Sequence, residues 1–597
     1  MCSDEKNTNL YKIRHSLAHI MAQAVQDLFP DVELGFGPPI ETGFYYDFKF
    51  KEAFDPDCLK KIEKKMKHII KTNQGFESYN MSADEAQTYL LENNQKLKAE
   101  HAKFLSDKGL ELSFYKSGKF VDLCEGPHVE KSREIPAGCF QLDSVAGSYW
   151  KGDSNNEMLT RIYALCFENN EQLNVFIKER KLAQQRDHRK LGKELDLYVI
   201  DDEIGAGLPL WLPNGTVLKD ELENYAKDVE FKAGYKRIST PHITKEDLYY
   251  RSGHLPYYKD TMYSPIDIDG ENYYLKPMNC PHHHKVFSSK PKSYKDLPLR
   301  FAEYGTCYRY ESSGSLTGLL RVRALSMNDA HIYCTKDQVK DEFKKVLKMH
   351  KDYYEKFRIE KYWVRLSLHA QDKDKFIDDE DGWVFTENIV RDCLEELDIK
   401  YKAEEGEAAF YGPKVDFQIR NVIGREETAS TNQLDFGIAD RFDLKYTGED
   451  GDFHQPYIIH RAPLGTHERF LAFLIEHYGG AFPTWMSPVQ VKLIPVADVF
   501  MDYAKELEEL FFANGFRVEI DTSNDSFSKK VRKAITTKTP NMLILGDDER
   551  TNKTVTWRRY CTKVQKTISS EDFLTILKDT VSNRKMDNFE DVELLEV

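Results

Sequence analysis

The sequence contains no long hydrophobic run and no secretion signal. None of its segments reaches the about 18 consecutive apolar residues that a membrane-spanning helix needs. Its first residues, MCSDEKNTNLYKIRHSLAH, hold neither an apolar core of signal-peptide length nor a small-residue cleavage site. We therefore expect a soluble, cytoplasmic protein that works away from membranes.

Cysteine is scarce, with 10 residues spread over a chain of 597. Without a secretion signal, such cysteines are more often free thiols or metal ligands than disulfides. Internal repeats and low-complexity tracts are missing too. The composition, 41% hydrophobic and 31% charged, is typical of globular proteins, and the length predicts several domains, each with its own core.

The net charge of −15 argues against a nucleic-acid partner, but the distribution of charge does not. Lysine and arginine outnumber acidic residues in two stretches, residues 177–193 and 526–570. Phosphate contacts depend on the local field, so an acidic protein can carry a basic face. The alternative is that these stretches are solvated helix faces, and composition alone favours this alternative.

The pattern of hydrophobic residues divides the chain into four parts and predicts a multidomain α+β protein. In the first part, residues 60–71 and 83–94 have helical periodicity, and residues 43–48 read as a strand. The last part alternates strands with helices, which is typical of a small α/β domain. The expected parts are residues 1–167, a charged helical connector at 168–195, the largest block at 196–485, and 486–597.

The stretch 275–333 predicts an antiparallel hairpin with cations spaced along it. One strand-like run ends at Arg309 and Glu311, and after a Ser/Gly-rich loop a second run carries Arg321. Guanidinium groups on rigid strands suit a polyphosphate, because their planar forks pair bidentately with phosphate oxygens. Arg469 opens an apolar helix after a glycine loop, which is also a good phosphate site. Ordinary surface pairing with neighbouring acidic residues is the alternative.

Two ligand pairs of equal spacing lie in the first part. His15 and His19 are four residues apart in an apolar-periodic stretch, which places both on one face of a helix. Cys124 and His128 have the same spacing in a loop-like segment. Together these residues indicate either a zinc site or a histidine-lined hydrolytic pocket. Ordinary core histidines are the third interpretation.

A further possible metal site consists of Cys280, His331 and His460, which are far apart in the sequence. Each of them ends or lies within a strand-like run. Three protein ligands with an open position are typical of a catalytic zinc. The histidine run at 282–284 leaves the ligand count open, and spacing alone does not select this triplet.

Taken together, the motifs resemble the threonyl-tRNA synthetases, a family of class II aminoacyl-tRNA synthetases, over nearly the whole chain. HSLAH, GFYYDF, VDLCEGPH and YWKGDSNN are similar to the family's α/β editing domain, and RDHRKLGKELDLY to its linker. KPMNCP, YRYE, GSLTGLLRVR, NDAHIYC, AFYGPKVDF and LGTHERF are similar to its antiparallel-sheet catalytic domain, and the tail to its α/β anticodon-binding domain. Because HSLAH begins at His15, we expect the family's N-terminal ubiquitin-like domain to be absent.

The resemblance implies roles in the catalytic domain. Arg309 would contact the α-phosphate and the substrate carboxylate, Arg469 would contact the γ-phosphate, and His254 would assist transfer to tRNA. The implied ATP-binding residues are Arg309, Glu311, Arg321 and Arg469, the substrate-binding residues Asp329, Tyr411 and Gln433, and the zinc ligands Cys280, His331 and His460. The resemblance thus implies one Zn²⁺ per subunit and Mg²⁺ bound with ATP.

It also implies an editing pocket, an anticodon contact surface and a partner subunit. Residues 215–241 resemble motif 1, the helix and strand through which the family forms homodimers. The implied editing residues are His15, His19, Tyr46, Lys98, Asp122, Cys124 and His128, and the implied anticodon contacts are Asn524, Glu549 and Arg558. The expected substrates are L-threonine, ATP and tRNA(Thr).

Such an enzyme needs an activation site and a separate editing site, because two other amino acids, valine and serine, closely resemble threonine. Valine replaces the hydroxyl with a methyl, and a site built to bind a hydroxyl rejects such an analogue by roughly 10⁴-fold or more. Serine keeps the hydroxyl, and one missing methyl is worth only about 1–3 kcal/mol. A second site that hydrolyses seryl-tRNA(Thr) would supply the missing accuracy. The first site would join threonine to AMP and then to the 3′ end of tRNA.

Some positions differ from the family pattern. Met327 stands where a glutamine is usual, Asn328 replaces the first residue of an acidic pair, and CPHHH replaces CPGH. EETASTNQLDF lacks the Trp-Gln expected a few residues before Gln433. Methionine cannot donate the hydrogen bond that a glutamine offers a carboxylate. These changes favour an alternative, a non-charging paralogue that binds tRNA or regulates, whereas the complete arginine and zinc-ligand sets disfavour it.

Overall fold

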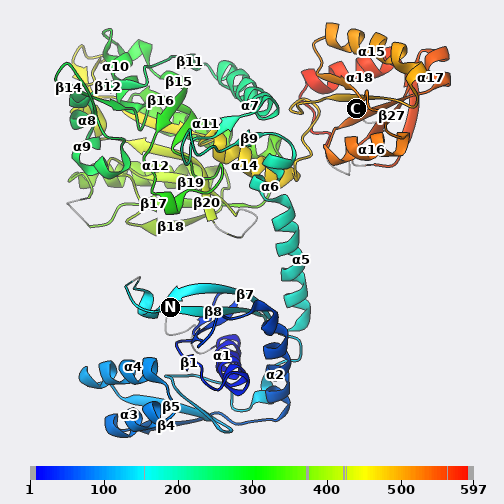
Figure 1. The fold of residues 1–597 in the computed structure, drawn as a ribbon. Helices are drawn as coiled ribbons and strands as arrows, with labels where there is room; N and C mark the ends of the chain where they lie inside the picture. The colour runs from blue at the N-terminus through cyan, green and yellow to red at the C-terminus, as the bar shows by residue number, and fades with distance from the viewer. Residues whose placement is uncertain are drawn as a thin grey trace. The chain divides into compact units, whose positions relative to one another are not determined.

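The computed structural model describes residues 8–588, apart from residues 154, 372–374, 421–423, 425 and 561 (Figure 1). Contacts divide the chain into two compact units, residues 1–181 and 182–597. None of the helices formed by the described residues combines the length and apolarity that crossing a bilayer requires. Each unit has its own core, and the two are described in turn.

The first unit is built on a five-stranded antiparallel sheet with helix α1 (Asn9–Leu28) packed against it. The strands pair in the order β1-β3-β8-β7, and β2 pairs with β3. Apolar residues at helical spacing, such as Ile13, Leu17 and Met21, bury one side of α1 in the core. The strands are β1 (Glu33–Leu34), β2 (Pro39–Ile40), β3 (Gly43–Lys49), β7 (Phe140–Tyr149) and β8 (Met158–Cys166).

A smaller three-stranded sheet with its own helices completes this unit. Ser82 begins helix α3 with a capping box, in which Glu85 bonds back to the Ser82 backbone. Its elements are β4 (Glu77–Met81), β5 (Leu112–Ser117), β6 (Phe120–Leu123), α3 (Ala83–Glu92) and α4 (Lys96–Asp107), while α2 (Leu59–Lys71) packs with α1. The two helices and the strand predicted from residues 43–94 are confirmed.

The predicted helical connector consists of two helices, α5 (Asn170–Arg186) and α6 (His188–Glu194). Asp187 separates them, and its side chain caps α6 by accepting a hydrogen bond from the Arg189 backbone. The boundary between the compact units falls within α5. The four-part division of the chain stays a prediction, because the two units do not separate residues 196–485 from 486–597.

The second unit contains an eight-stranded sheet in the order β11-β15-β16-β23-β20-β19-β17-β18. Only the two edge pairs, β11–β15 and β17–β18, are parallel. Helices α7 (Pro213–Lys232), α11 (Val339–Lys356), α12 (Glu380–Glu396) and α14 (His467–Tyr478) share one apolar core with the sheet. The strands are β11 (Lys236–Arg237), β15 (Leu299–Tyr308), β16 (Ala324–Cys334), β17 (Tyr362–Leu368), β18 (Tyr401–Glu405), β19 (Lys414–Arg420), β20 (Glu426–Asp435) and β23 (Tyr457–Ala462).

Strands β15 and β16 form the predicted antiparallel hairpin, but its arginines lie elsewhere than expected. β15 ends at Tyr308 and β16 begins at Ala324, so Arg309 and Arg321 lie in the connection between them. The prediction that these guanidinium groups are carried on the strands is wrong. Gly318, with a φ of 49°, and the Ser313–Gly314 step lie in this connection, where the chain turns and both strands end early.

The C-terminal part of this unit has a separate five-stranded sheet, in the order β25-β24-β26-β27-β28. Parallel pairing of β24 with β25 and β26, joined by helices, gives the predicted α/β pattern. Its elements are β24 (Val491–Pro495), α15 (Met501–Ala513), β25 (Val518–Ile520), α16 (Phe527–Thr536), β26 (Asn541–Leu545), α17 (Asp547–Asn552), β27 (Thr554–Arg559), β28 (Gln565–Ser569) and α18 (Ser570–Ser582).

A buried ion pair joins α7 to the central sheet of the second unit. The Arg461 guanidinium on β23 lies 2.8 Å from the Glu230 carboxylate, and their side chains are 0% and 1% exposed. Tyr304 also donates a hydrogen bond of 2.8 Å to Glu230. We therefore expect this ion pair to stabilise the packing of α7 against the eight-stranded sheet.

Replacing Glu230 with alanine is expected to destabilise the second unit by about 3–5 kcal/mol, because it leaves the Arg461 charge buried without a partner. Thermal unfolding followed by circular dichroism would measure the loss. Asp228→Ala is the matched control: Asp228 is on the same helix, is 55% exposed and pairs with Arg584. An exposed pair is worth at most about 1 kcal/mol, so equal losses in the two variants would contradict the expectation.

Candidate active sites

One pocket of the second unit brings together most of the predicted catalytic residues. Its walls come from the middle of the large sheet, from the connection between β15 and β16, and from the starts of α10 (Cys280–Ser288) and α14. The predicted residues that line it are Cys280, Arg309, Glu311, Arg321, Asp329, Tyr411, Gln433, His460 and Arg469. Residues more than 180 positions apart thus meet at one site.

The possible ligand atoms of Cys280, His331 and His460 lie within 4.8 Å of one another. The two histidines are direct cross-strand neighbours on β16 and β23. Cys280 begins helix α10, so the prediction that it ends a strand is wrong. The preceding strand, β14 (Glu271–Leu275), has already ended. Pro281 follows it at the first turn of the helix, where a proline fits without loss of a hydrogen bond.

The hydrogen bonds of the two histidines leave one nitrogen of each ring for a ligand. His460 donates from Nε2 to Asp435 at 2.7 Å. Among the described residues, His460 Nδ1 and His331 Nε2 are buried and have no hydrogen-bond partner. A cysteine sulfur and two such imidazole nitrogens form a donor set that suits zinc.

Backbone carbonyls hold the predicted phosphate-binding arginines in place. Arg469 donates to Leu320 O at 3.0 Å and to Thr428 O at 2.9 Å, and Arg309 donates to Pro277 O at 3.3 Å. Burial lowers the pKa of the Arg469 guanidinium, and the nearby charges of Arg309 and Arg321 contribute in the same direction. Two guanidinium groups with fixed directions, with Arg321 lining the same pocket, suit a polyphosphate.

The remaining predicted substrate contacts lie beside the predicted metal ligands. Tyr411 stacks on the His460 ring at 5.2 Å and donates a hydrogen bond to Gln433. Asp329 accepts a hydrogen bond of 3.2 Å from Asn279. Met327, the residue that differs from the family pattern, lines the same pocket and is half-buried.

His254 lies outside the lining of this pocket and is 7% exposed. Its Nδ1 is 2.7 Å from Ser252 Oγ. Burial, followed by the charge of Arg309, lowers the pKa of His254 to about 4, so the ring is neutral at pH 7. His254 is therefore a buried, neutral imidazole that lies within the electrostatic influence of Arg309.

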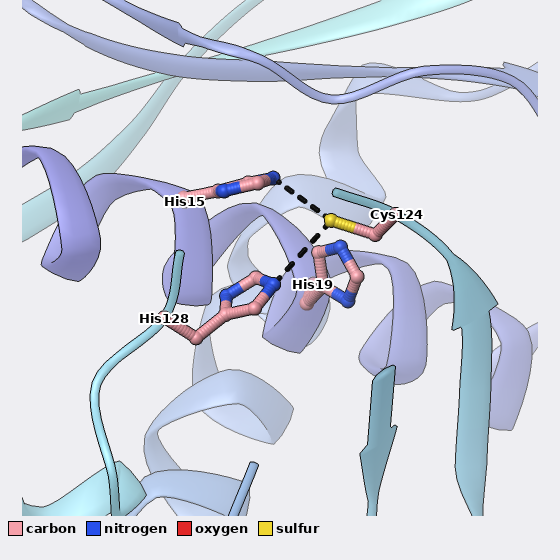
Figure 2. Close-up of side chains that lie close together, drawn as sticks. All are labelled: His15, His19, Cys124 and His128. Carbon is pink, nitrogen blue, oxygen red and sulfur yellow. Dashed lines mark hydrogen bonds between the residues drawn. The ribbon is translucent and has the colours of Figure 1, made fainter. Parts of the chain in front are cut away.

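The seven predicted editing residues gather in the first unit. α1 carries His15 and His19, and the loop after β6 carries Cys124 and His128, as predicted. Figure 2 shows the four side chains converging, and their ligand atoms lie within 4.8 Å of one another. Cys124 Sγ is 3.2 Å from His15 Nε2 and 3.5 Å from His128 Nε2.

The other three editing residues form a buried charge cluster beside these four. Asp122 pairs with Lys98 Nζ at 2.8 Å, accepts a hydrogen bond of 2.5 Å from Tyr46, and lies 3.8 Å from His19 Nε2. Burial is the main cause that lowers the pKa of His19 and of His128 well below the usual value. This cluster therefore combines neutral imidazoles with the buried Lys98–Asp122 ion pair.

A hydrogen bond in this cluster indicates which ring nitrogen of His15 carries a proton. Its Nδ1 is 3.2 Å from Pro127 O, and a carbonyl only accepts, so Nδ1 carries the proton and Nε2 faces Cys124 as an acceptor. An imidazole with this lone pair could accept a proton from water or bind a metal. Both interpretations made from the sequence therefore stay open.

The predicted anticodon contacts are spread over the C-terminal sheet and its loops. Asn524 is exposed after β25, Arg558 lies on β27, and Glu549 lies on α17. The Glu549 carboxylate accepts from Thr556 Oγ1 at 2.6 Å and from the Gly546 backbone at 2.8 Å. None of the contacts described for this part of the chain joins the three residues directly.

Three regions of the chain match known domain families. Residues 263–478 match the tRNA synthetase class II core domain (G, H, P, S and T), and residues 490–580 match the anticodon binding domain. Residues 112–163 match the threonyl and alanyl tRNA synthetase second additional domain. With the sheet and pocket described above, these matches define a class II aminoacyl-tRNA synthetase.

The curated relatives narrow this class. The chain is 45% identical over 577 residues to the threonine–tRNA ligase of Geobacillus kaustophilus, covering 96% of this chain and 88% of that one. It is 44% identical over 584 residues to that of Oceanobacillus iheyensis, covering 98% and 90%. The chain therefore belongs to the threonine–tRNA ligase family.

Solved structures agree with this membership. The RNA-binding domain of threonyl-tRNA synthetase from Cryptosporidium parvum superposes with a TM-score of 0.63 at 34% identity, covering 66% of this chain and 98% of that one. A putative threonyl-tRNA synthetase from Aeropyrum pernix superposes with a TM-score of 0.58 at 29% identity, covering 68% and 97%.

Two acidic residues near the predicted metal ligands were not themselves predicted. Asp435 orients His460, and Glu303 on β15 is bonded to His283, the middle residue of the histidine run. The QLDF motif contains Asp435 and could have drawn attention to it. Glu303 has no comparable signal, because only the strand register places it near α10.

Proposed function

We propose that the chain charges tRNA(Thr) with threonine at the pocket of the second unit and hydrolyses seryl-tRNA(Thr) in the pocket of the first. The observation that carries the proposal is the convergence of three arginines and the Cys280/His331/His460 triplet on one pocket. The arginine side chains suit the phosphates of ATP. A zinc ion held by the triplet would suit the amino group and hydroxyl of a β-hydroxy amino acid. A ligase reaction needs both substrates side by side.

Zinc is proposed to sit between Cys280, His331 and His460, because their orphan nitrogens and sulfur match its preferred ligands. The ion would offer an open position to the amino group and hydroxyl of threonine. Asp329 would accept from the same hydroxyl, and Tyr411 and Gln433 would close the pocket around the side chain. Valine would leave these groups without a partner.

In the activation step, the threonine carboxylate attacks the α-phosphate of ATP and pyrophosphate leaves. Arg309 would hold the α-phosphate and the carboxylate together, while Arg469, with Mg²⁺, would neutralise charge on the γ-phosphate. Glu311 and Arg321 would position the nucleotide. The tRNA ribose hydroxyl then attacks the carbonyl of threonyl-adenylate, the bond to the phosphate breaks and AMP leaves, and His254 would help to move the hydroxyl proton.

In the editing step, Lys98 and His15 would position and deprotonate the water that attacks seryl-tRNA(Thr). The lone pair on His15 Nε2 and the fixed Lys98–Asp122 pair support these roles. His19, Tyr46, Cys124 and His128 would shape the pocket for serine. Asn524, Glu549 and Arg558 are proposed to read the anticodon, and a cytoplasmic homodimer through residues 215–241 remains a prediction.

The alternative, a paralogue that binds tRNA without charging it, is not favoured. Family membership at 44–46% identity extends over the catalytic core as well as the RNA-binding parts. Met327 removes one hydrogen-bond donor but leaves the arginines and the triplet in place. The test is aminoacylation of tRNA(Thr) by the purified chain: threonine attached to tRNA supports the proposal, and tight tRNA binding without charging supports the alternative.

Arg469→Ala is expected to lower the rate of threonine-dependent ATP–pyrophosphate exchange by about 10²–10³-fold, because a fixed positive charge beside the reacting phosphates is lost. Exchange of labelled pyrophosphate into ATP measures this. Arg420→Ala is the matched control, since Arg420 is on β19, 69% exposed and paired with Glu426. An Arg469→Ala rate equal to that of the control would remove this arginine from the reaction.

A further inference from the structure

The three consecutive histidines of α10 have three different environments. His282 is 7% exposed, and neither of its ring nitrogens has a partner among the described residues. His284 Nδ1 lies 3.0 Å from the Tyr333 hydroxyl. His283, which is fully buried, is the member of the run that connects an acidic residue to a proposed zinc ligand.

The connection runs through both nitrogens of the His283 ring. Its Nε2 is 3.0 Å from Glu303 Oε2, and its Nδ1 is 2.8 Å from His331 Nδ1. A carboxylate only accepts, so His283 Nε2 carries a proton and donates it. Between the two Nδ1 atoms one must donate and the other accept, which makes the protonation of His331 depend on that of His283.

Further contacts hold the Glu303 carboxylate in place. Lys276 Nζ lies 3.5 Å from it, and the two side chains are 0% and 5% exposed. Thr240 donates to the same carboxylate from its backbone N–H at 2.7 Å. The group that accepts the His283 Nε2 proton is therefore fixed, which orients the His283 ring.

With its proton on Nε2, His283 offers Nδ1 as an acceptor, and His331 Nδ1 donates to it. His331 then carries its lone pair on Nε2, the atom that is buried without a partner among the described residues. This is the tautomer that can bind a metal, and the hydrogen bond also fixes the plane of the ring.

We propose that Glu303 and His283 form a positioning relay that holds His331 in its zinc-binding tautomer and orientation. The inference rests on the proposed zinc site and deepens it. His460 obtains the same effect from Asp435 directly, through one hydrogen bond of 2.7 Å. The relay gives the middle histidine of the CPHHH motif a role that its two neighbours do not share.

The test compares His283→Phe with His284→Phe in the full-length chain. Both variants replace a fully buried ring of the same helix, but only His283→Phe interrupts the relay. Zinc affinity is measured by competition with a chromophoric chelator. We expect a 10–100-fold loss for His283→Phe, which is typical when the partner of a metal-bound histidine is removed, and less than about a threefold change for His284→Phe.

His283→Asn separates positioning from packing. Its side-chain carbonyl can accept from His331 Nδ1 without reaching Glu303, so we expect it to recover part of the lost affinity. Cobalt-loaded protein gives a second readout, because its visible spectrum reports the ligand set: His283→Phe should alter the spectrum, while His284→Phe should leave it as in the unsubstituted chain.

The outcomes distinguish a failure of the Glu303–His283 relay from a failure of the zinc site on which it rests. An unsubstituted chain that binds zinc, together with a His283→Phe variant of equal affinity and unchanged cobalt spectrum, overturns the relay alone. Equal losses in His283→Phe and His284→Phe, without recovery in His283→Asn, also overturn it, because packing would then explain the effect. An unsubstituted chain that binds no zinc contradicts the zinc site and the relay together.

Discussion

Replacing Cys280 with serine is expected to remove bound zinc and to abolish the discrimination between threonine and valine. Cys280, His331 and His460 supply the only protein ligands proposed, and a serine hydroxyl is a far poorer zinc ligand than a thiolate. Without the ion, the threonine hydroxyl loses its main partner. The preference for threonine, roughly 10⁴-fold or more in an intact hydroxyl-binding site, should then fall towards unity.

The measurement combines metal analysis with ATP–pyrophosphate exchange at saturating threonine and at saturating valine. Cys393→Ser is the matched control, because Cys393 is buried in α12 and bonds to the Lys340 carbonyl. It should retain one zinc per chain and the full preference. A Cys280→Ser variant that still rejects valine would place threonine recognition elsewhere in the pocket.

His15→Ala is expected to lower the hydrolysis of seryl-tRNA(Thr) by about 10²–10⁴-fold, the range that a positioned general base contributes. Threonylation should continue, since the second unit contains the activation pocket. Serine and threonine differ by one methyl, worth about 10–200-fold in the activation pocket. The variant should therefore accumulate seryl-tRNA(Thr) whenever serine is in excess over threonine.

Deacylation of preformed seryl-tRNA(Thr) measures this effect directly. His68→Ala is the control, because His68 is an exposed histidine of α2 outside the editing pocket. Unchanged deacylation in His15→Ala would contradict the editing role. Repeating the assay on the unsubstituted chain with a chelator decides between the two interpretations of the four-ligand cluster, since only a metal-dependent pocket loses activity.

The helices and strands with strong periodicity were predictable from the sequence. The helices predicted at 60–71 and 83–94 correspond to α2 and α3, and HSLAH lies on α1 as its spacing requires. Short elements such as α17 and β28 were not predictable, because their few residues provide too little periodicity. The ends of β15 and β16 were placed too far into the loop, because strand-like composition does not reveal where the chain turns.

The candidate sites were predictable where a family motif carries the residue. His331 and His460 lie opposite each other because of strand register, which spacing could not have revealed. The same holds for Glu303, which reaches His283 only through the fold of β15 against α10. Long-range pairing of this kind is a property of the tertiary structure, whereas helical spacing such as His15–His19 is local.

Amino-acid-dependent ATP–pyrophosphate exchange by the zinc-loaded chain tests the central claim most directly. Exchange is predicted with threonine and, more weakly, with serine, while valine should support it roughly 10⁴-fold less efficiently. Two results would contradict a zinc-dependent threonine-activating site. One is a zinc-loaded chain that catalyses no exchange with any amino acid, and the other is exchange with valine that is as efficient as with threonine.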